Sequence, residues 1–135
     1  MLMKAQVATE YVLIIGVLLF ITIPIFYYAL SESKESTRVN QAYDSVNMVA
    51  KTADSVYALG AGNKRYVWVN VPEGVVSTYL QNHTIAITLS AFGSNSDFVA
   101  LTSANVTGTL PTSQGRFRIA VEMLDSGIVQ IGQQS

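Results

Sequence analysis

The first feature of the chain is an uncharged, almost entirely apolar run that covers residues 11–30. Thirteen of its 20 residues are Val, Leu, Ile or Phe, and aromatic side chains stand near both ends. A helix of 20 residues is about 30 Å long, which matches the hydrocarbon thickness of a bilayer. On the insertion scale, the thirteen side chains favour entry by about 4 to 8 kcal/mol in total. The pattern therefore predicts a membrane-spanning helix near the N-terminus, with the bulk of the chain exported.

A second helical pattern follows directly. Between residues 39 and 57, apolar side chains recur at spacings of three and four, and polar side chains fill the other positions. The apolar positions are Val39, Ala42, Tyr43, Val46, Val49, Ala50, Ala53, Val56 and Tyr57. No Gly or Pro occurs in residues 25–59, and Gly60-Ala61-Gly62 then supplies residues that end helices. We predict one helix over residues 6–59, with an apolar part at 6–30 and an amphipathic part at 31–59.

Beyond residue 62 the hydrophobic period shortens to two, which is typical of half-buried strands. Strand candidates lie at 65–71, 75–80, 84–89, 97–102, 106–110, 116–123 and 128–131. Clusters of turn-forming residues separate them, including one around Asn82 and one around Gly93. A third, Asp125-Ser126-Gly127, predicts a hairpin between the last two strands. Residues 60–135 are therefore predicted to form a β-domain of about six or seven antiparallel strands, in a sheet or sandwich.

An amphipathic helix and a half-polar sheet each have an apolar face that must be buried, and each can cover the apolar face of the other. We therefore expect an α+β fold, lollipop-like, in which residues 39–57 pack across the inner face of the sheet. Tyr66 and Trp68 share one strand face, and we expect them to pack in the core rather than against a neighbouring subunit. The apolar residues up to 30 have no partner within the chain, so they need lipid or other copies of themselves.

Composition excludes several functions. The formal net charge is −1 and the eight Lys and Arg residues are scattered, which argues against a nucleic-acid partner. The chain has no cysteine and one histidine, so a disulfide, a thiol nucleophile or a zinc–thiolate site is ruled out, and His83 has no second histidine beside which to bind a metal. No pair of carboxylates is spaced for acid–base catalysis. We expect no enzymatic activity, no metal and no cofactor.

Two Asn-x-Thr sequons begin at Asn82 and Asn105. Such sequons carry N-linked glycans on the surface of exported proteins. Both asparagines are therefore candidates for N-glycosylation.

The residues that lead into the apolar run are similar to those of a known family. The segment Gln6-Val7-Ala8-Thr9-Glu10-Tyr11, behind a short leader with a single Lys, resembles the class III signal peptide of archaeal type IV pilins. The resemblance implies that a prepilin peptidase cuts between Ala5 and Gln6, which removes the leader of residues 1–5 and makes Glu10 the fifth residue of the mature chain. Ala5 stands where the family more often has Gly. The order of the later segments is also similar, so the resemblance covers essentially the whole chain.

The resemblance also implies a function. The chain would be a membrane-inserted precursor that a pilus assembly platform transfers into an extracellular filament on the cell surface. Copies of the chain would form this homopolymer through their apolar helices, and the filament would serve adhesion. Gly16 and Pro24 then bear on assembly: Pro24 leaves the carbonyl of Phe20 without a helical donor, so the helix is expected to bend or loosen near residues 16–24. The hydroxyl of Thr22 is a candidate to compensate.

Glu10 has a physical role that can be argued without the family. Cleavage before Gln6 creates an α-ammonium group four residues from Glu10, at the apolar end of the helix. A charge there costs a few kcal/mol unless it is paired. Pairing of the two groups, within one subunit or between neighbours, would set the register of the subunits. A simpler reading is a carboxylate in the first helical turn, which the helix macrodipole favours by about 0.3 to 1 kcal/mol.

Three other functions remain open. A small-x-small site at Ala29-Leu30-Ser31 would let ordinary signal peptidase release a secreted β-domain. An uncut chain would be a membrane-anchored β-domain that binds a ligand at the cell surface. An archaellin-like subunit of a rotating filament is a subordinate alternative. The first residue of the mature chain distinguishes a pilin from a secreted domain and from an anchored protein. A pilin would start at Gln6, a secreted domain at Glu32 and an anchored protein at Met1.

Overall fold

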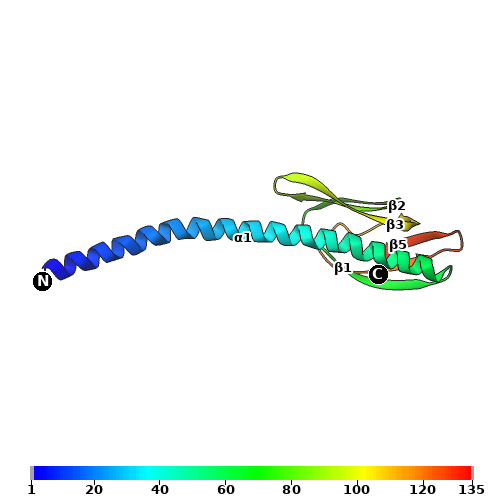
Figure 1. Ribbon diagram of the computed structural model, residues 1–135, viewed down its shortest axis with the longest axis horizontal. Helices are drawn as coiled ribbons and strands as arrows, with labels where there is room; N and C mark the ends of the chain where they lie inside the picture. The colour runs from blue at the N-terminus through cyan, green and yellow to red at the C-terminus, as the bar shows by residue number, and fades with distance from the viewer. Residues whose placement is uncertain (1, 135) are drawn as a thin grey trace. The chain divides into compact units, whose positions relative to one another are not determined.

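The computed structural model describes residues 2–134, and the chain divides into two compact units, Met1–Glu35 and Ser36–Ser135. One helix, α1 (Leu2–Leu59), accounts for the first unit and opens the second (Figure 1). It begins four residues before the expected start at Gln6, because Leu, Met, Lys and Ala are all good helix formers. It ends where predicted. The N–H of Gly60, at φ +95°, donates to the carbonyl oxygens of Val56 and Tyr57, both at 3.2 Å.

The first unit is helical throughout its described residues, and α1 continues across Pro24 without a break. The hydroxyl of Thr22 donates to the carbonyl oxygen of Leu18 at 2.6 Å. It therefore does not supply the donor that Pro24 withholds from the carbonyl of Phe20, which was the compensation expected. Loosening of residues 16–24 stays a prediction for the assembled filament.

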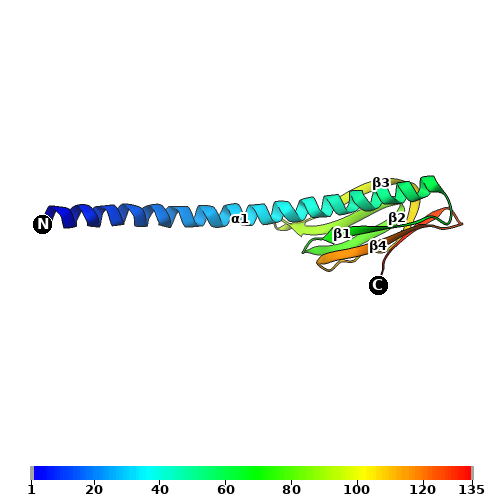
Figure 2. The same cartoon turned by 90° about the horizontal axis from the view of Figure 1, so that it is seen from below.

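In the second unit, the last part of α1 lies along one face of a mixed sheet (Figures 1 and 2). The strands are β1 (Lys64–Val71), β2 (Val75–Ala91), β3 (Ser94–Gly108), β4 (Gly115–Met123) and β5 (Ile128–Gln133), in the order β1-β4-β5-β3-β2. β3 and β5 run parallel, and the other neighbours are antiparallel. The α+β class, with a long helix packed on a sheet, is confirmed.

The expected number and direction of strands were wrong: the described residues form five strands, and one pair is parallel. The turn predicted around Asn82 is instead an irregularity inside β2, where Asn82 has φ +56° and the register with β3 shifts. The register shifts by three residues between the pairs Asn82–Val106 and Thr84–Leu101, and neither strand ends there. The predicted strands 75–80 and 84–89 therefore join in β2, and 97–102 and 106–110 join in β3. The turn predicted around Gly93 is a two-residue hairpin loop, with Phe92 at φ +52° and Gly93 at φ +78°.

The core lies between the amphipathic part of α1 and the inner face of the sheet. Six of the nine predicted helix positions are buried, namely Ala42, Val46, Val49, Ala50, Ala53 and Val56. Ala42 packs with Leu89 and Ala91 of β2. The other five pack against alternate residues of the strands, among them Ile85, Ile119, Val121, Val129 and Ile131. Tyr43 and Tyr57 flank this stripe and stay 57% and 45% exposed. The helix therefore buries a narrower stripe than predicted.

The outer face of the sheet contradicts the core packing expected for two aromatic residues. Tyr66 and Trp68 are 42% and 52% exposed, whereas Val69 and Val71 of the same strand are buried. Successive strand residues point to opposite faces. Since α1 covers the face that receives the valines, the aromatic rings project from the other one.

Candidate functional site

The main feature of the first unit is the exposed apolar surface of its helix. Large hydrophobic side chains between residues 7 and 30 are 41% to 81% exposed, with Ile15 at the low end and Phe20 at the high end. They surround the helix on all sides, as in a segment that is buried in a membrane or a larger core. Monomeric soluble proteins rarely expose contiguous apolar patches beyond a few hundred Å². By length and composition, α1 could cross a membrane.

Gln6 and Glu10 are both exposed and lie four residues apart, so they share one side of α1. Glu10 forms no ion pair with the described residues of its own chain. A second copy of the chain could therefore approach its carboxylate without displacing a partner.

The bond predicted to be cut, between Ala5 and Gln6, lies inside α1. The hydroxyl of Thr9 donates to the carbonyl oxygen of Ala5 at 2.8 Å. Proteolysis acts on locally opened chain, so cleavage here requires the first turns of the helix to unwind.

The structure does not bring Gly16 and Pro24 close to Glu10. At about 1.5 Å per residue they lie roughly 9 and 21 Å further along the helix axis. A Cβ built on Gly16 meets no heavy atom within 4 Å, so nothing in the chain itself requires a glycine there. Any requirement for a small residue at Gly16 comes from a neighbouring molecule.

Both sequon asparagines are exposed on the sheet unit, Asn82 in β2 and Asn105 in β3. Asn105 lies between the buried Ala104 and Val106, so strand alternation directs its side chain to the outer face. Both side chains are accessible to a glycosylating enzyme.

Arg38 is a structural residue that the sequence analysis missed. Its Nε donates to the carbonyl oxygen of Glu73 and its Nη2 to that of Ser90, both at 2.8 Å. It thereby ties α1 to the β1–β2 turn and to the end of β2. No local signal could have revealed this, because the partners are 35 and 52 residues away in sequence.

Two buried or half-buried polar groups of α1 hold the sheet in a similar way. Ser45 is 3% exposed, and the carbonyl oxygens of Asn70 and Gln41, both at 2.7 Å, share the one proton of its hydroxyl. Asp54 accepts a hydrogen bond from the backbone N–H of Ser103 at 2.8 Å. These contacts fix the helix on both β1 and β3.

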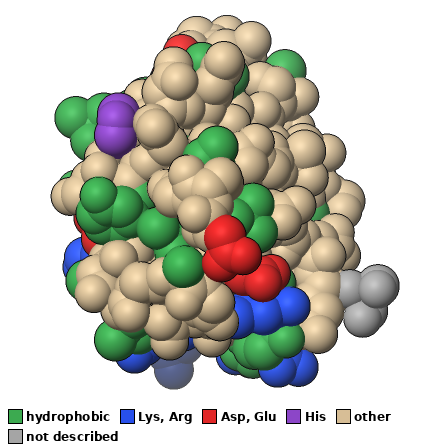
Figure 3. Space-filling model, turned by 90° about the vertical axis from the view of Figure 1, so that its right-hand side faces the viewer, with side chains coloured by type: hydrophobic (Ala, Val, Ile, Leu, Met, Phe, Trp, Pro, Cys, Tyr) green, Lys and Arg blue, Asp and Glu red, His purple; other side chains and the backbone are tan. Residues whose placement is uncertain are grey.

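Charged side chains of the sheet unit are unevenly distributed. Viewed from the end on the right of Figure 1, Lys and Arg side chains gather mainly along one edge, with acidic side chains beside them (Figure 3). No group of three or more His, Asp or Glu residues within residues 2–134 could hold a metal ion.

Comparison with protein-family models, with curated proteins and with solved structures gives no match.

Proposed function

We propose that this chain is the structural subunit of an extracellular archaeal type IV pilus that serves adhesion. The observation that carries the proposal is the apolar helix surface between residues 7 and 30, which has no partner within the described chain. The hydrophobic effect favours burial of such a surface in proportion to its area, by roughly 25 cal/mol per Å². Lipid buries it in the precursor, and sister helices bury it in the filament.

The leader supports the same function. Ala5 and Gln6 stand at the cleavage position of a prepilin, and Glu10 has the position of the acidic fifth residue. Removal of residues 1–5 by a prepilin peptidase leaves an α-ammonium group at Gln6. Between staggered subunits, this group neutralises the Glu10 carboxylate of a neighbour, so the apolar core excludes subunits that are out of register.

The sheet unit suits display on the outside of the filament. It has its own core, contains both sequons on its exposed surface and needs no contact with lipid. The partners of the chain are then copies of itself, the prepilin peptidase, the assembly platform and, before assembly, the membrane.

The central test replaces Glu10. We expect Glu10→Gln to leave membrane insertion intact and to reduce the yield of filaments sheared from cells at least tenfold, as counted by electron microscopy. Glu32→Gln removes the same charge at the far end of the apolar run and should leave the yield within twofold. Equal filament yields from Glu10→Gln and wild type would refute the pairing of charges.

Sequencing the mature N-terminus tests the proposal independently. A start at Gln6 in material purified from filaments supports a pilin. The alternative is a protein anchored in the membrane by α1, which is long and apolar enough for that role. Intact Met1 in a chain that stays in the membrane fraction, with no filaments containing it, would establish this alternative.

A further inference from the structure

The outer face of β1 and β4 carries an alternating row of aromatic and cationic side chains, which we call the cationic ladder. Its members are Lys64, Tyr66 and Trp68 on β1 and Arg116 and Arg118 on β4. In register, Trp68 lies opposite Arg118 and Tyr66 opposite Ala120, so the two strands present these residues on the same face. This face is opposite to the one that packs on α1.

The guanidinium groups lie over the aromatic rings. The guanidinium carbon of Arg118 is 4.0 Å from the ring centroid of Tyr66, and that of Arg116 is 4.9 Å from the ring centroid of Trp68. Lys64 Nζ is 5.4 Å from the Tyr66 ring. A stacked guanidinium keeps the N–H donors on its edge free for a planar anion such as a carboxylate. Stacking also restricts its rotamers, so less entropy is lost when it binds.

None of the three cations forms an ion pair with another residue in the described part of the chain. Among the described residues, the one carboxylate on this part of the face belongs to Glu122, which is opposite Lys64 in register. The described side chains of the face therefore sum to a charge of +2, in a chain whose formal net charge is −1. This charge is moderate and confined to one side of the sheet unit.

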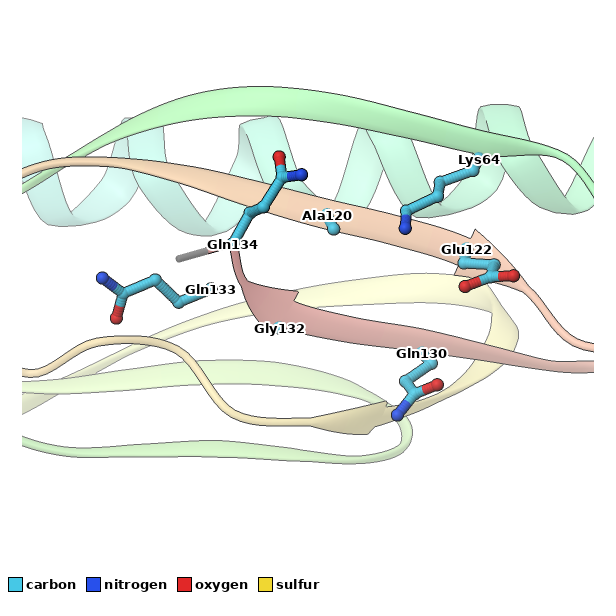
Figure 4. Close-up of a pocket in the computed structure, with 7 residues that line it drawn as sticks. All are labelled: Lys64, Ala120, Glu122, Gln130, Gly132, Gln133 and Gln134. Carbon is cyan, nitrogen blue, oxygen red and sulfur yellow. The ribbon is translucent and has the colours of Figure 1, made fainter.

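A polar concavity adjoins the ladder (Figure 4). It has a volume of about 310 Å³ and is lined by Lys64, Ala120, Glu122, Gln130, Gly132, Gln133 and Gln134. The view in Figure 4 looks onto the sheet with α1 behind it, and the small residues Ala120 and Gly132 lie between the longer side chains. Carboxamides both donate and accept hydrogen bonds, which suits hydroxyl groups better than phosphates, since phosphates only accept at neutral pH.

We propose that the cationic ladder and this concavity form a binding surface for a carboxylate-bearing polysaccharide. The stacked arginines bind the carboxylates, the exposed face of Trp68 packs on the C–H face of a sugar ring, and the glutamines bind hydroxyls. A single-stranded nucleic acid would use the same rings and cations. The carboxamides of the concavity favour a hydroxyl-rich polymer over one whose backbone offers phosphate acceptors alone. The inference extends the adhesive role proposed above but does not depend on polymerisation.

The test uses the full chain dispersed in a neutral detergent, where filament formation plays no part. The probe is polygalacturonate, and its methyl ester serves as the uncharged counterpart. Trp68 is the only tryptophan of the chain, so a change in its fluorescence on titration locates binding at the ladder. Calorimetry gives the affinity. We expect the acidic polymer to change the emission and to bind at least tenfold more tightly than the ester.

The variant Arg116→Gln/Arg118→Gln should weaken binding of polygalacturonate at least tenfold. Arg65→Gln is the matched control, because Arg65 is an exposed cation of β1 whose register partner, Val121, belongs to the inner face. It should leave the affinity within twofold. Unchanged melting temperatures establish that each variant is folded. The proposal is overturned by absent binding, by an equal loss in Arg65→Gln, by binding without a change in Trp68 emission, or by tighter binding of single-stranded DNA.

Discussion

Gly108 is the residue at which the sheet tolerates a side chain least. It ends β3, pairs with Ile131 in the parallel β3–β5 ladder and has φ +125°. A Cβ built there collides with the carbonyl group of Ile131, which is backbone and cannot swing aside as a long side chain could. The same carbonyl oxygen accepts the N–H of Thr109 at 3.1 Å. Gly108→Ala therefore combines an unfavourable backbone conformation with a displaced strand.

Two terms give the size of the effect. A non-glycine residue in a sparsely populated region of φ costs about 1 to 3 kcal/mol. Loss of the hydrogen bond between Thr109 and Ile131 adds about 0.5 to 1.5 kcal/mol. We expect Gly108→Ala to lower the free energy of unfolding by roughly 2 to 4 kcal/mol, which corresponds to a fall in melting temperature of roughly 10 to 30 °C for a unit of this size.

Two other glycines separate these terms. Gly93 has φ +78° in the β2–β3 hairpin, yet a Cβ there meets nothing within 4 Å, so Gly93→Ala isolates the backbone cost of about 1 to 2 kcal/mol. Gly132 is the neighbour of Ile131 in β5 and has neither a positive φ nor a close contact. Gly132→Ala should change stability by less than about 0.5 kcal/mol.

Thermal unfolding of the full chain in detergent, followed by Trp68 emission, measures all three variants. Trp68 belongs to β1, so its signal reports on the sheet unit and not on the apolar helix in the micelle. The expected order of melting temperatures is Gly132→Ala, then Gly93→Ala, then Gly108→Ala as the lowest. If Gly108→Ala and Gly93→Ala melt together, the close approach of Gly108 to Ile131 is refuted.

Two further predictions concern the attachment of α1 to the sheet. Arg38→Ala should lower the unfolding free energy by about 2 kcal/mol, because it removes two charge-assisted hydrogen bonds to the Glu73 and Ser90 carbonyls at a partly solvated site. Lys51 is exposed, so the control Lys51→Ala should cost less than about 0.5 kcal/mol. Equal losses of unfolding free energy in denaturant titrations of the two variants would contradict this role of Arg38. Val49 is 0% exposed, so Val49→Ala should cost about 2 kcal/mol and lower the denaturant midpoint, and an unchanged midpoint would contradict the packing of this helix face on the sheet.

The sequence was sufficient for the features that depend on local pattern. The end of α1 at Leu59 follows from Gly60, and the buried stripe around Val49 follows from spacings of three and four. The hairpin between β4 and β5 was predicted from Asp125-Ser126-Gly127, where the N–H of Leu124 donates to the carbonyl oxygen of Ile128 at 2.9 Å. In each case, neighbouring residues determine the structure.

The features that were not predicted depend on contacts between distant residues. Asn82 is typical of a turn, but β3 continues to pair on both sides of it, so the chain forms a bulge instead. The parallel pairing of β3 with β5 brings together residues that no local pattern relates, such as Gly108 and Ile131. Alternation within β1 shows only that Trp68 and Val69 lie on opposite faces of the sheet. Trp68 is exposed because α1 covers the face that carries Val69, and the local pattern does not determine which face the helix covers.

The hydrophobic pattern of the apolar helix does not determine whether lipid or sister helices bury it. A helix that is apolar on every side can be buried equally well by either. Under the proposed function, Glu10 would break this equivalence, because lipid supplies no cation for its carboxylate, while a processed neighbour would supply an α-ammonium group. A membrane interior disfavours an ionised carboxylate by a few kcal/mol, and pairing in the proposed filament would remove that penalty. We therefore expect this one carboxylate to favour transfer of the helix from membrane to filament only after the leader has been cut.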